Sequence, residues 1–250
     1  MRANALPFAK VLTPFRNPKN IIAIDASRQP EPACISQWSA SAAKRRFDLV
    51  CVVLTLPLTL PILLLTALAV RLTSRGPVLF RQRRMGCHGR AFVIFKFRTM
   101  HVRTSADRGT ITTLLNQPFT PVGPFLRHWK LDELPQVFNV LRGDMSLVGP
   151  RPRIPRSEPS PLPCRPGITG RATLVFAQEE SALTRVREAD LDFYYDSVIL
   201  PMKRRLDADY MSEATFRSDL GMIVRSLFRR WEECEAENSL PLIESELLPG

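Results

Sequence analysis

The chain has 250 residues, of which 45% are hydrophobic, and 35 Lys and Arg against 24 Asp and Glu give a net charge of +11. This length suits one ordinary domain with tails, and the apolar content excludes a disordered chain. The excess positive charge falls between residues 41 and 150, where it would favour an anionic membrane surface or nucleic acid. Nucleic acid is disfavoured, because the charge flanks an apolar run and no known nucleic-acid motif is present.

The cysteines and histidines indicate neither a disulfide framework nor a zinc site. The five cysteines are scattered, odd in number and form no CxxC pair, which favours a reducing compartment. The three histidines lack metal-ligand spacing. Residues 1–40 show no sustained period and predict an extended or partly disordered N-terminal segment.

The run from Leu49 to Val70 contains no charged residue. As a straight helix it would be about 33 Å long, enough to cross the hydrocarbon core of a bilayer. Two features favour a re-entrant helix-break-helix over about residues 45–72 instead. Pro57 and Pro61 predict a break near Pro61, and basic residues on both flanks favour the cytoplasmic side for both ends. A proline-kinked spanning helix and a buried soluble helix remain alternatives.

The rest of the chain predicts an α+β fold that is mainly helical. Strands are expected at 78–82 and 91–100, joined by a hairpin loop around Gly86 to Gly89. Helices are expected at 131–142, at 181–206 with a break at Pro201, and at 215–231. The last of these is amphipathic and suits either a core or a membrane interface. Residues 154–166 predict a proline-rich loop, residues 41–230 are expected to form the main folded domain, and residues 231–250 predict an acidic solvated tail.

Two adjacent carboxylates, Asp132 and Glu133, stand at the start of the predicted helix over 131–142. Acids are common at helix starts for electrostatic reasons alone. Here, however, many cations accompany them, which suggests a phosphate-rich substrate with a divalent metal. The candidate phosphate-binding residues are Arg84, Lys96, Arg98, Arg127 and Arg151.

Several motifs together resemble the bacterial sugar transferases, the monotopic polyprenyl-phosphate sugar-1-phosphate transferases. The motifs are Lys44-Arg-Arg-Phe-Asp48, Gly76-Pro-Val-Leu-Phe-Arg-Gln82 with Arg84 and Gly86 after it, Phe95-Lys-Phe-Arg-Thr-Met100, Leu131-Asp-Glu-Leu-Pro-Gln136 continuing to Gly149-Pro-Arg-Pro152, and Arg165-Pro-Gly-Ile-Thr-Gly170. The resemblance runs from about Lys44 to Phe228, and the long middle motif is highly specific.

The resemblance implies transfer of a sugar-1-phosphate from a nucleotide diphosphate sugar, a UDP-sugar by preference, to undecaprenyl phosphate, with release of nucleoside monophosphate. This would be the first membrane step of exopolysaccharide, O-antigen or glycoprotein glycan synthesis. Asp132 would be the nucleophile and carry a covalent phosphosugar, and Asp132 with Glu133 would hold Mg²⁺. Arginines such as Arg127 and Arg151 would offset the phosphate charge.

The resemblance also implies a re-entrant helix and interfacial helices around a site on the cytoplasmic face of the bacterial inner membrane. The implied partners are the nucleotide sugar, the polyprenyl phosphate, anionic membrane lipid, later glycosyltransferases of the pathway and a second copy of the chain in a homo-oligomer. Four departures from the family pattern leave the sugar and nucleotide open: Leu60 before the break proline, Lys130 before the Leu-Asp-Glu, the short proline-rich segment 153–164, and the stretch after Gly170. A non-catalytic basic membrane scaffold of the same fold is the alternative.

Overall fold

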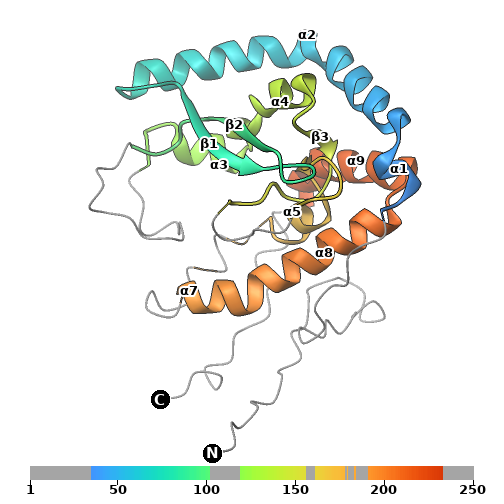
Figure 1. Ribbon diagram of the computed structural model, residues 1–250. Coiled ribbons are helices and arrows are strands. Elements are labelled where there is room, and N and C mark those ends of the chain that lie inside the picture. Colours follow the sequence, from blue (N-terminus) through green and yellow to red (C-terminus); the bar gives the residue numbers. More distant parts are fainter. Residues whose placement is uncertain are drawn as a thin grey trace, which may run out of the picture.

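The computed structural model describes residues 35–101, 119–155, 161–177, 179, 183 and 191–232. These residues form a mixed helix and strand fold that is mostly helical, as the sequence predicts. In Figure 1 the helix α2 arches over the top of the molecule, the segment from α7 to α8 runs along the bottom, and the smaller elements lie between them. Most of the predicted N-terminal segment and nearly all of the acidic tail lie outside the described residues.

The long helix α2 (Ala42–Thr73) includes the whole uncharged run. It follows the short helix α1 (Gln37–Ala40) and begins where the Ser41 side chain accepts a hydrogen bond from the Lys44 amide. The chain stays helical through Pro57 and Pro61, so the break predicted near Pro61 is instead a bend in one continuous helix (Figure 1). In the same stretch the Thr55 hydroxyl donates to Cys51 O, one turn earlier, at 2.8 Å.

One face of α2 packs on the body of the molecule and the other is exposed. Its buried residues recur at helical spacing: Lys44, Asp48, Val52, Leu63, Thr66 and Val70. On the outer face Leu54 is 74% and Leu72 is 75% exposed. Within the described residues α2 is the one helix that is long and apolar enough to cross a membrane, and only 17% of its apolar window is buried. A helix in a soluble core would be mostly buried, so α2 indicates membrane association.

The predicted hairpin is present as β1 (Leu79–Met85) and β2 (Ala91–Phe97), paired antiparallel from Leu79 with Phe97 to Met85 with Ala91. Its turn places His88 and Gly89 at positive φ, 53° and 75°. The free edge of β2 is covered by Asn139, which is fully buried. Asn139 Oδ1 accepts from Phe95 N, and its Nδ2 donates to Val93 O. This side chain therefore ties the hairpin to helix α4 (Gln136–Arg142).

The helix predicted over 131–142 is divided in two. Helix α3 (Gly123–His128) leads to Lys130, whose φ is 49°, and a 3₁₀ turn, η2 (Leu131–Glu133), comes before α4. Pro135 stands at the N-cap of α4, where its missing amide hydrogen costs nothing. The two carboxylates consequently lie on a separate tight turn in front of the helix.

A small parallel pair, β3 (Ser146–Val148) with β4 (Gly167–Thr169), joins two of the sequence motifs. Gly149 N donates to Thr169 O, and Gly167 N donates to Pro150 O, each at 2.9 Å. A Cβ at Gly149 or Gly167 would meet backbone atoms at 2.6 or 2.1 Å. Only glycine lets these two backbones approach so closely.

The last described elements are helical. The described elements of this part are α5 (Arg171–Val175), α7 (Leu191–Tyr194), a π-helical turn η4 (Tyr195–Ile199), α8 (Leu200–Glu213) and α9 (Phe216–Glu232). The break predicted at Pro201 is wrong, because the chain stays helical through this residue. The wide π turn lies just before Pro201, which then occupies the first turn of α8, where proline is tolerated.

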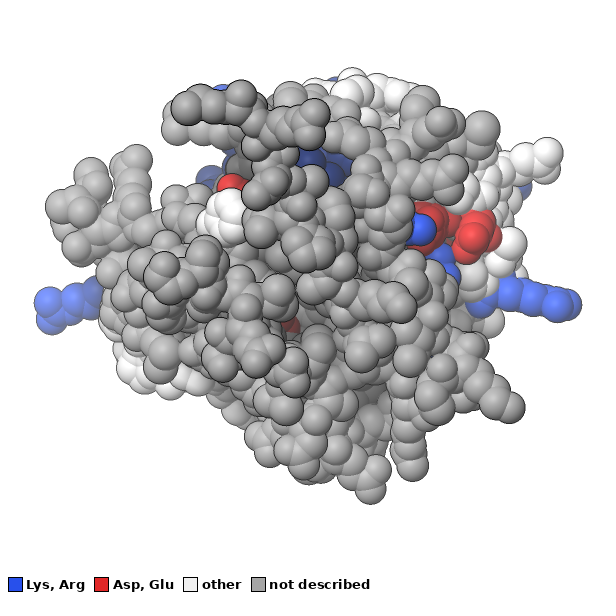
Figure 2. Space-filling view, turned by 90° about the horizontal axis from the view of Figure 1, so that it is seen from below, with Lys and Arg blue, Asp and Glu red and all other residues white. Residues whose placement is uncertain are grey.

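The charges of the described residues are mixed on the lower face of the molecule. Figure 2 shows that face, with basic and acidic side chains next to one another at one edge. An ion pair of this kind joins Arg171 to Glu213 at 3.0 Å. This agrees with the sequence, in which the positive excess lies before residue 150.

Candidate active site

The two carboxylates of the 3₁₀ turn have different surroundings. Asp132 is 9% exposed, and its Oδ1 is buried without a hydrogen-bond partner in the described part of the chain. Glu133 accepts a hydrogen bond from Lys96 Nζ at 2.7 Å. The left-handed backbone at Lys130 starts the turn, and such strain in a non-glycine residue is common at functional sites. The turn therefore presents one paired and one unpaired carboxylate.

The pKa values of the two carboxyls move in opposite directions. Burial raises the pKa of Asp132 to about 6, and the neighbouring Glu133 carboxylate adds to the rise. For Glu133 burial also acts to raise the pKa, but the charge and hydrogen bond of Lys96 outweigh it and lower the pKa to about 2. At neutral pH both groups are ionised, and Asp132 is the more basic. A more basic carboxylate is the better nucleophile.

Arg127 approaches the carboxylates from the end of α3. Burial lowers the pKa of its guanidinium, and the charges of Asp132 and Glu133 act against that fall. The guanidinium also lies over the Phe119 ring, 5.5 Å from its centroid. Lys96, Lys130 and Arg127 all lower the pKa of Asp132, so three elements deliver cations to one carboxylate.

Arg151 reaches the same site from the motif that follows β3. Its backbone is held by the glycine-dependent pairing of β3 with β4 and by a hydrogen bond from Arg151 N to Asp207 Oδ2 at 3.2 Å. Desolvation by the surrounding chain acts to lower the pKa of the guanidinium, but the charges of Glu179, Tyr195, Glu133 and Asp207 raise it above the usual value. Arg151 is therefore a permanent cation whose charge is felt at Glu133.

Arg84 lies close to Arg151. Both line a small cavity of about 60 Å³ together with Tyr195, Lys203 and Asp207. Arg84 donates to Gln82 Oε1 at 2.7 Å and to Pro152 O at 3.2 Å. The predicted phosphate ligand Arg84 thus lies beside the Gly149–Pro152 motif and Arg151. Lys96 and Arg127 lie next to the two carboxylates.

Arg98 occupies a different position from the other predicted phosphate ligands. It is buried at the end of α2, where its Nη2 donates to Ser74 O at 2.9 Å and to Ser74 Oγ at 2.6 Å. Its Nε and Nη1 have no hydrogen-bond partner among the described residues. A phosphate contact of Arg98 stays a prediction, and its visible role is to tie β2 to the membrane helix.

Sequence reasoning missed the residues that support Arg151. Lys203 is 4% exposed, contacts both carboxylate oxygens of Glu179 at 2.5 Å, and lies 5.1 Å from the centroid of the Tyr195 ring. Lys203 and Asp207 are one helical turn apart on α8. In a sequence such a pair is typical of a solvated helix face, and no local signal reveals that this face is buried.

The residues present fit a magnesium ion. No group of three or more His, Cys, Asp and Glu side chains in the described part could hold a metal by protein ligands alone. Mg²⁺ is usually held by one or two carboxylates together with substrate phosphates. The buried, unpartnered Oδ1 of Asp132 beside Glu133 provides that smaller set.

The family model for bacterial sugar transferases matches residues 39–232 of this chain. The chain belongs to the bacterial sugar transferase family. The match runs from the second half of α1 to the end of α9 and so includes every residue of the candidate site. The resemblance stated from the motifs is confirmed.

Several curated proteins are similar to this sugar transferase over part of its length. It is 44% identical over 165 residues to the UDP-glucose:undecaprenyl-phosphate glucose-1-phosphate transferase of Caulobacter vibrioides, covering 60% of this chain and 61% of that protein. It is 48% identical over 124 residues to the undecaprenyl-phosphate glucose phosphotransferase of Komagataeibacter xylinus, covering 49% and 23%. A UDP-N-acetylgalactosamine-undecaprenyl-phosphate N-acetylgalactosaminephosphotransferase of Aeromonas hydrophila is 38% identical over 162 residues, covering 61% and 38%. The chain thus spans between about a quarter and three fifths of these relatives.

Proposed function

We propose that this sugar transferase is a phosphoglycosyl transferase. It moves a sugar-1-phosphate from a UDP-sugar to undecaprenyl phosphate and releases UMP. The observation that carries the proposal is the buried, unpartnered Asp132 carboxylate, surrounded by cations, on a family motif. The names of the relatives support the two substrates, and they differ in the sugar, so the sugar is left to experiment.

In the first step an oxygen of Asp132 attacks the phosphorus that bears the sugar. The bond from that phosphorus to the UMP oxygen breaks, and UMP leaves with the electron pair. Asp132 then carries the sugar-1-phosphate as an acyl phosphate. The high pKa of Asp132 makes it the more reactive carboxylate, whereas Glu133 is held as an anion by Lys96.

In the second step an oxygen of undecaprenyl phosphate attacks the same phosphorus. The bond to Asp132 breaks, the carboxylate is restored, and the lipid leaves as a diphosphate-linked sugar. Both steps bring an anion to an anionic phosphate, so the cations Lys96, Arg127 and Arg151 must offset the charge. Mg²⁺ held by Asp132 and Glu133 would supply further neutralisation of the diphosphate.

The site would lie at the cytoplasmic face of the inner membrane. The exposed outer face of α2 enters the bilayer, and the bend at Pro57 and Pro61 lets both basic ends return to one side. Near the carboxylates, Phe125 of α3 is 58% exposed and Trp129, directly after α3, is 45% exposed, as is typical of a membrane interface. Helix α9 adds a second apolar stripe, formed by Phe216, Leu220, Val224 and Leu227. There a soluble nucleotide sugar and a lipid phosphate can meet.

A UMP-release assay tests this function. The purified chain is supplied with undecaprenyl phosphate, Mg²⁺ and each of a panel of UDP-sugars. One UDP-sugar should yield UMP and a lipid-linked sugar diphosphate, and Asp132→Asn should yield neither. If no UDP-sugar is turned over while the protein remains folded and membrane-bound, the alternative of a non-catalytic membrane scaffold replaces the proposal.

A further inference from the structure

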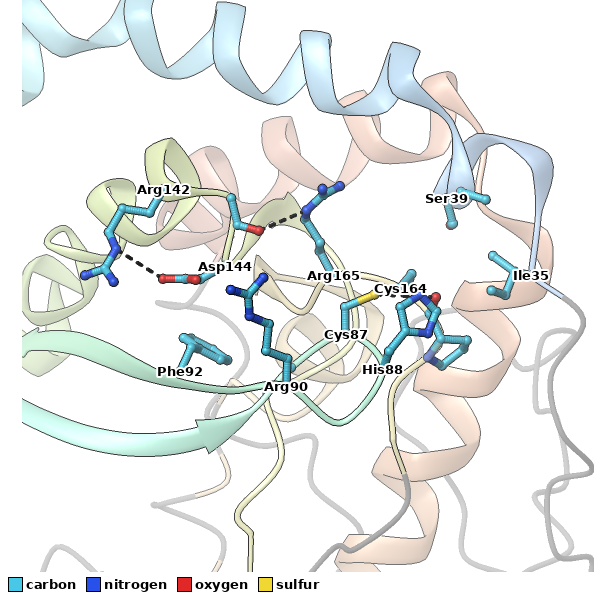
Figure 3. A pocket seen from close by; sticks show the side chains of 14 residues that line it. Ile35, Ser39, Cys87, His88, Arg90, Phe92, Arg142, Asp144, Cys164 and Arg165 are labelled. Atoms are coloured by element: carbon cyan, nitrogen blue, oxygen red, sulfur yellow. Dashed lines mark hydrogen bonds and ion pairs between the residues drawn. The ribbon is translucent and has the colours of Figure 1, made fainter.

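A second, larger cavity lies apart from the carboxylates. Its volume is about 790 Å³, which is within the range of small-molecule sites. The hairpin turn, the end of α4, the segment around Cys164 and the junction of α1 with α2 form its wall (Figure 3). Asp132 precedes the first turn of α4, whereas this cavity lies at the last turn, about 10 Å further along the helix.

The cavity is lined by three arginines and one acid. Figure 3 shows Arg90 and Arg142 on either side of Asp144, Arg165 pointing toward α2, and His88 on the turn beside Cys87. Buried apolar groups, among them the Phe92 ring, complete the wall. Guanidinium groups over an apolar floor are suited to a phosphate group that carries an organic substituent.

A structural role of the arginines explains only part of this arrangement. Arg165 Nε donates to Gly143 O at 3.0 Å, and Arg142 Nε lies 3.4 Å from Asp144 Oδ2, so both help to complete the end of α4. The side chain of Arg90 makes no hydrogen bond or ion pair with another described residue, although Arg90 lines the same cavity. One acid among three guanidinium groups leaves a positive surplus that an anion would balance.

The position of the cavity points to the membrane surface. Ser39 and Ala40 in its wall directly precede α2, and the exposed apolar face of α2 begins at Val50. The helical path from Ala42 to Val50 is about 12 Å long, so the cavity lies near the depth of lipid head groups when α2 is in the bilayer. A phosphate on a lipid head group would therefore reach these arginines without leaving the membrane.

We propose that this cavity binds a phosphate ester, separately from the catalytic carboxylates, with Arg90, Arg142 and Arg165 as its ligands. The shared chemistry is one phosphate on a small organic group, which a phospholipid head group or a soluble phosphate ester can supply. The proposal does not depend on the sugar-transfer reaction, since the cavity includes neither Asp132 nor Glu133.

The test compares Arg90→Gln with Arg83→Gln. Arg83 is an exposed arginine on β1 of the same hairpin and does not line the cavity, so it controls for general loss of charge. Full-length protein is reconstituted in nanodiscs of phosphatidylcholine with added phosphatidylglycerol, and native mass spectrometry counts the retained phosphatidylglycerol. In a second arm, calorimetry in neutral detergent measures binding of glycerol 3-phosphate and of inorganic phosphate.

Loss of one charge-assisted contact should weaken phosphate binding about tenfold in Arg90→Gln and leave it unchanged in Arg83→Gln. Arg90→Lys should recover part of the affinity. A loss confined to the nanodisc arm identifies the lipid head group, and a loss in the glycerol 3-phosphate arm identifies a soluble ester. Equal losses in both variants, no loss in Arg90→Gln, or no binding in either arm would overturn the proposal.

Discussion

At the scale of single residues, the site depends on the contrast between Asp132 and Glu133. The two carboxylates are neighbours in sequence, yet one is desolvated without a partner and the other is paired with Lys96. We expect Asp132→Asn to abolish turnover, because an amide cannot form the acyl phosphate. UMP release and membrane attachment are measured together, and wild-type release by the variant would contradict the covalent mechanism.

The same substitution should stabilise the ligand-free protein. Burial raises the pKa of Asp132 from 3.8 to about 6, so the cost of its charge is absent below pH 3.8, grows up to about pH 6 and is complete above it. The asparagine variant should gain about 1–3 kcal/mol at pH 7.5 and nothing near pH 3.8. Thermal unfolding at the two pH values measures this, and an equal gain at both would contradict the shift.

The first half-reaction should follow the ionisation of Asp132. UMP release without undecaprenyl phosphate avoids the titration of the lipid phosphate, and its rate should fall as pH drops below about 6. Lys96 lowers the pKa of both carboxyls, so Lys96→Gln should move the midpoint to higher pH. Arg81→Gln, on the exposed side of the same hairpin, should leave the midpoint in place. An unchanged midpoint in Lys96→Gln would remove Lys96 from this role.

Arg151 tests whether the cations act by geometry or only by charge. Its backbone is fixed by the β3–β4 pairing and by Asp207, so its guanidinium can hold a phosphate with two parallel hydrogen bonds. Arg151→Lys keeps the charge but loses this fork, and activity should fall at least tenfold, about 1.4 kcal/mol in the barrier. Arg151→Ala at matched membrane loading is the comparison. A lysine variant as fast as wild type would show that the fork is dispensable.

At the scale of elements, the existence of α2 could be predicted from the sequence, but its path through the two prolines could not. The uncharged run, its prolines and its basic flanks were enough to predict a membrane helix. They could not show that the helix continues through Pro57 and Pro61, because that depends on packing of Leu63, Thr66 and Val70 against the body. The same limit applies to the π turn before Pro201. The division of 131–142 into η2 and α4 likewise depends on the left-handed backbone at Lys130.

In the candidate site, too, the residues in continuous motifs could be predicted and the contacts between distant segments could not. Asp132, Glu133 and the arginine motif were predictable because each stands in a continuous motif. The pairing of Gly149 with Gly167 and the burial of Lys203 and Asp207 arise between segments far apart in sequence. Such contacts follow from the tertiary fold, and a single sequence contains no local sign of them.

The bend in α2 predicts on which side of the membrane its two ends lie. With the bend at its prolines, cysteines introduced at position 42 and at the exposed position 75 should both be labelled only from the cytoplasmic side of intact cells. Pro61→Leu removes one of the two prolines, so part of the population should then label at one end from outside. External labelling of either site in the otherwise wild-type chain would mean that α2 spans the membrane.

At the scale of the whole molecule, a buried polar network joins α1 and α2 to the C-terminal helices. Asp219 of α9 is 0% exposed, forms an ion pair with Lys44 of α2, and accepts hydrogen bonds from Trp38 Nε1 at 2.8 Å and from Tyr210 OH at 2.9 Å. One carboxylate thus connects the membrane helix with three other helices. The Tyr210 hydroxyl lies 3.1 Å from Val148 O, so this network also brings α8 against β3.

Removing this carboxylate should loosen the membrane helix from the catalytic body. In Asp219→Ala the Lys44 ammonium stays buried without its partner, and the loss should be about 3–5 kcal/mol. Asp209→Ala, on α8 and less buried, is the matched control and should change stability little. Thermal unfolding in detergent measures both variants.

Replacing both charges, as in Lys44→Met with Asp219→Leu, should recover part of the stability because no unpaired charge remains. If the double variant is no more stable than Asp219→Ala, the unpaired Lys44 is not the cause of the loss.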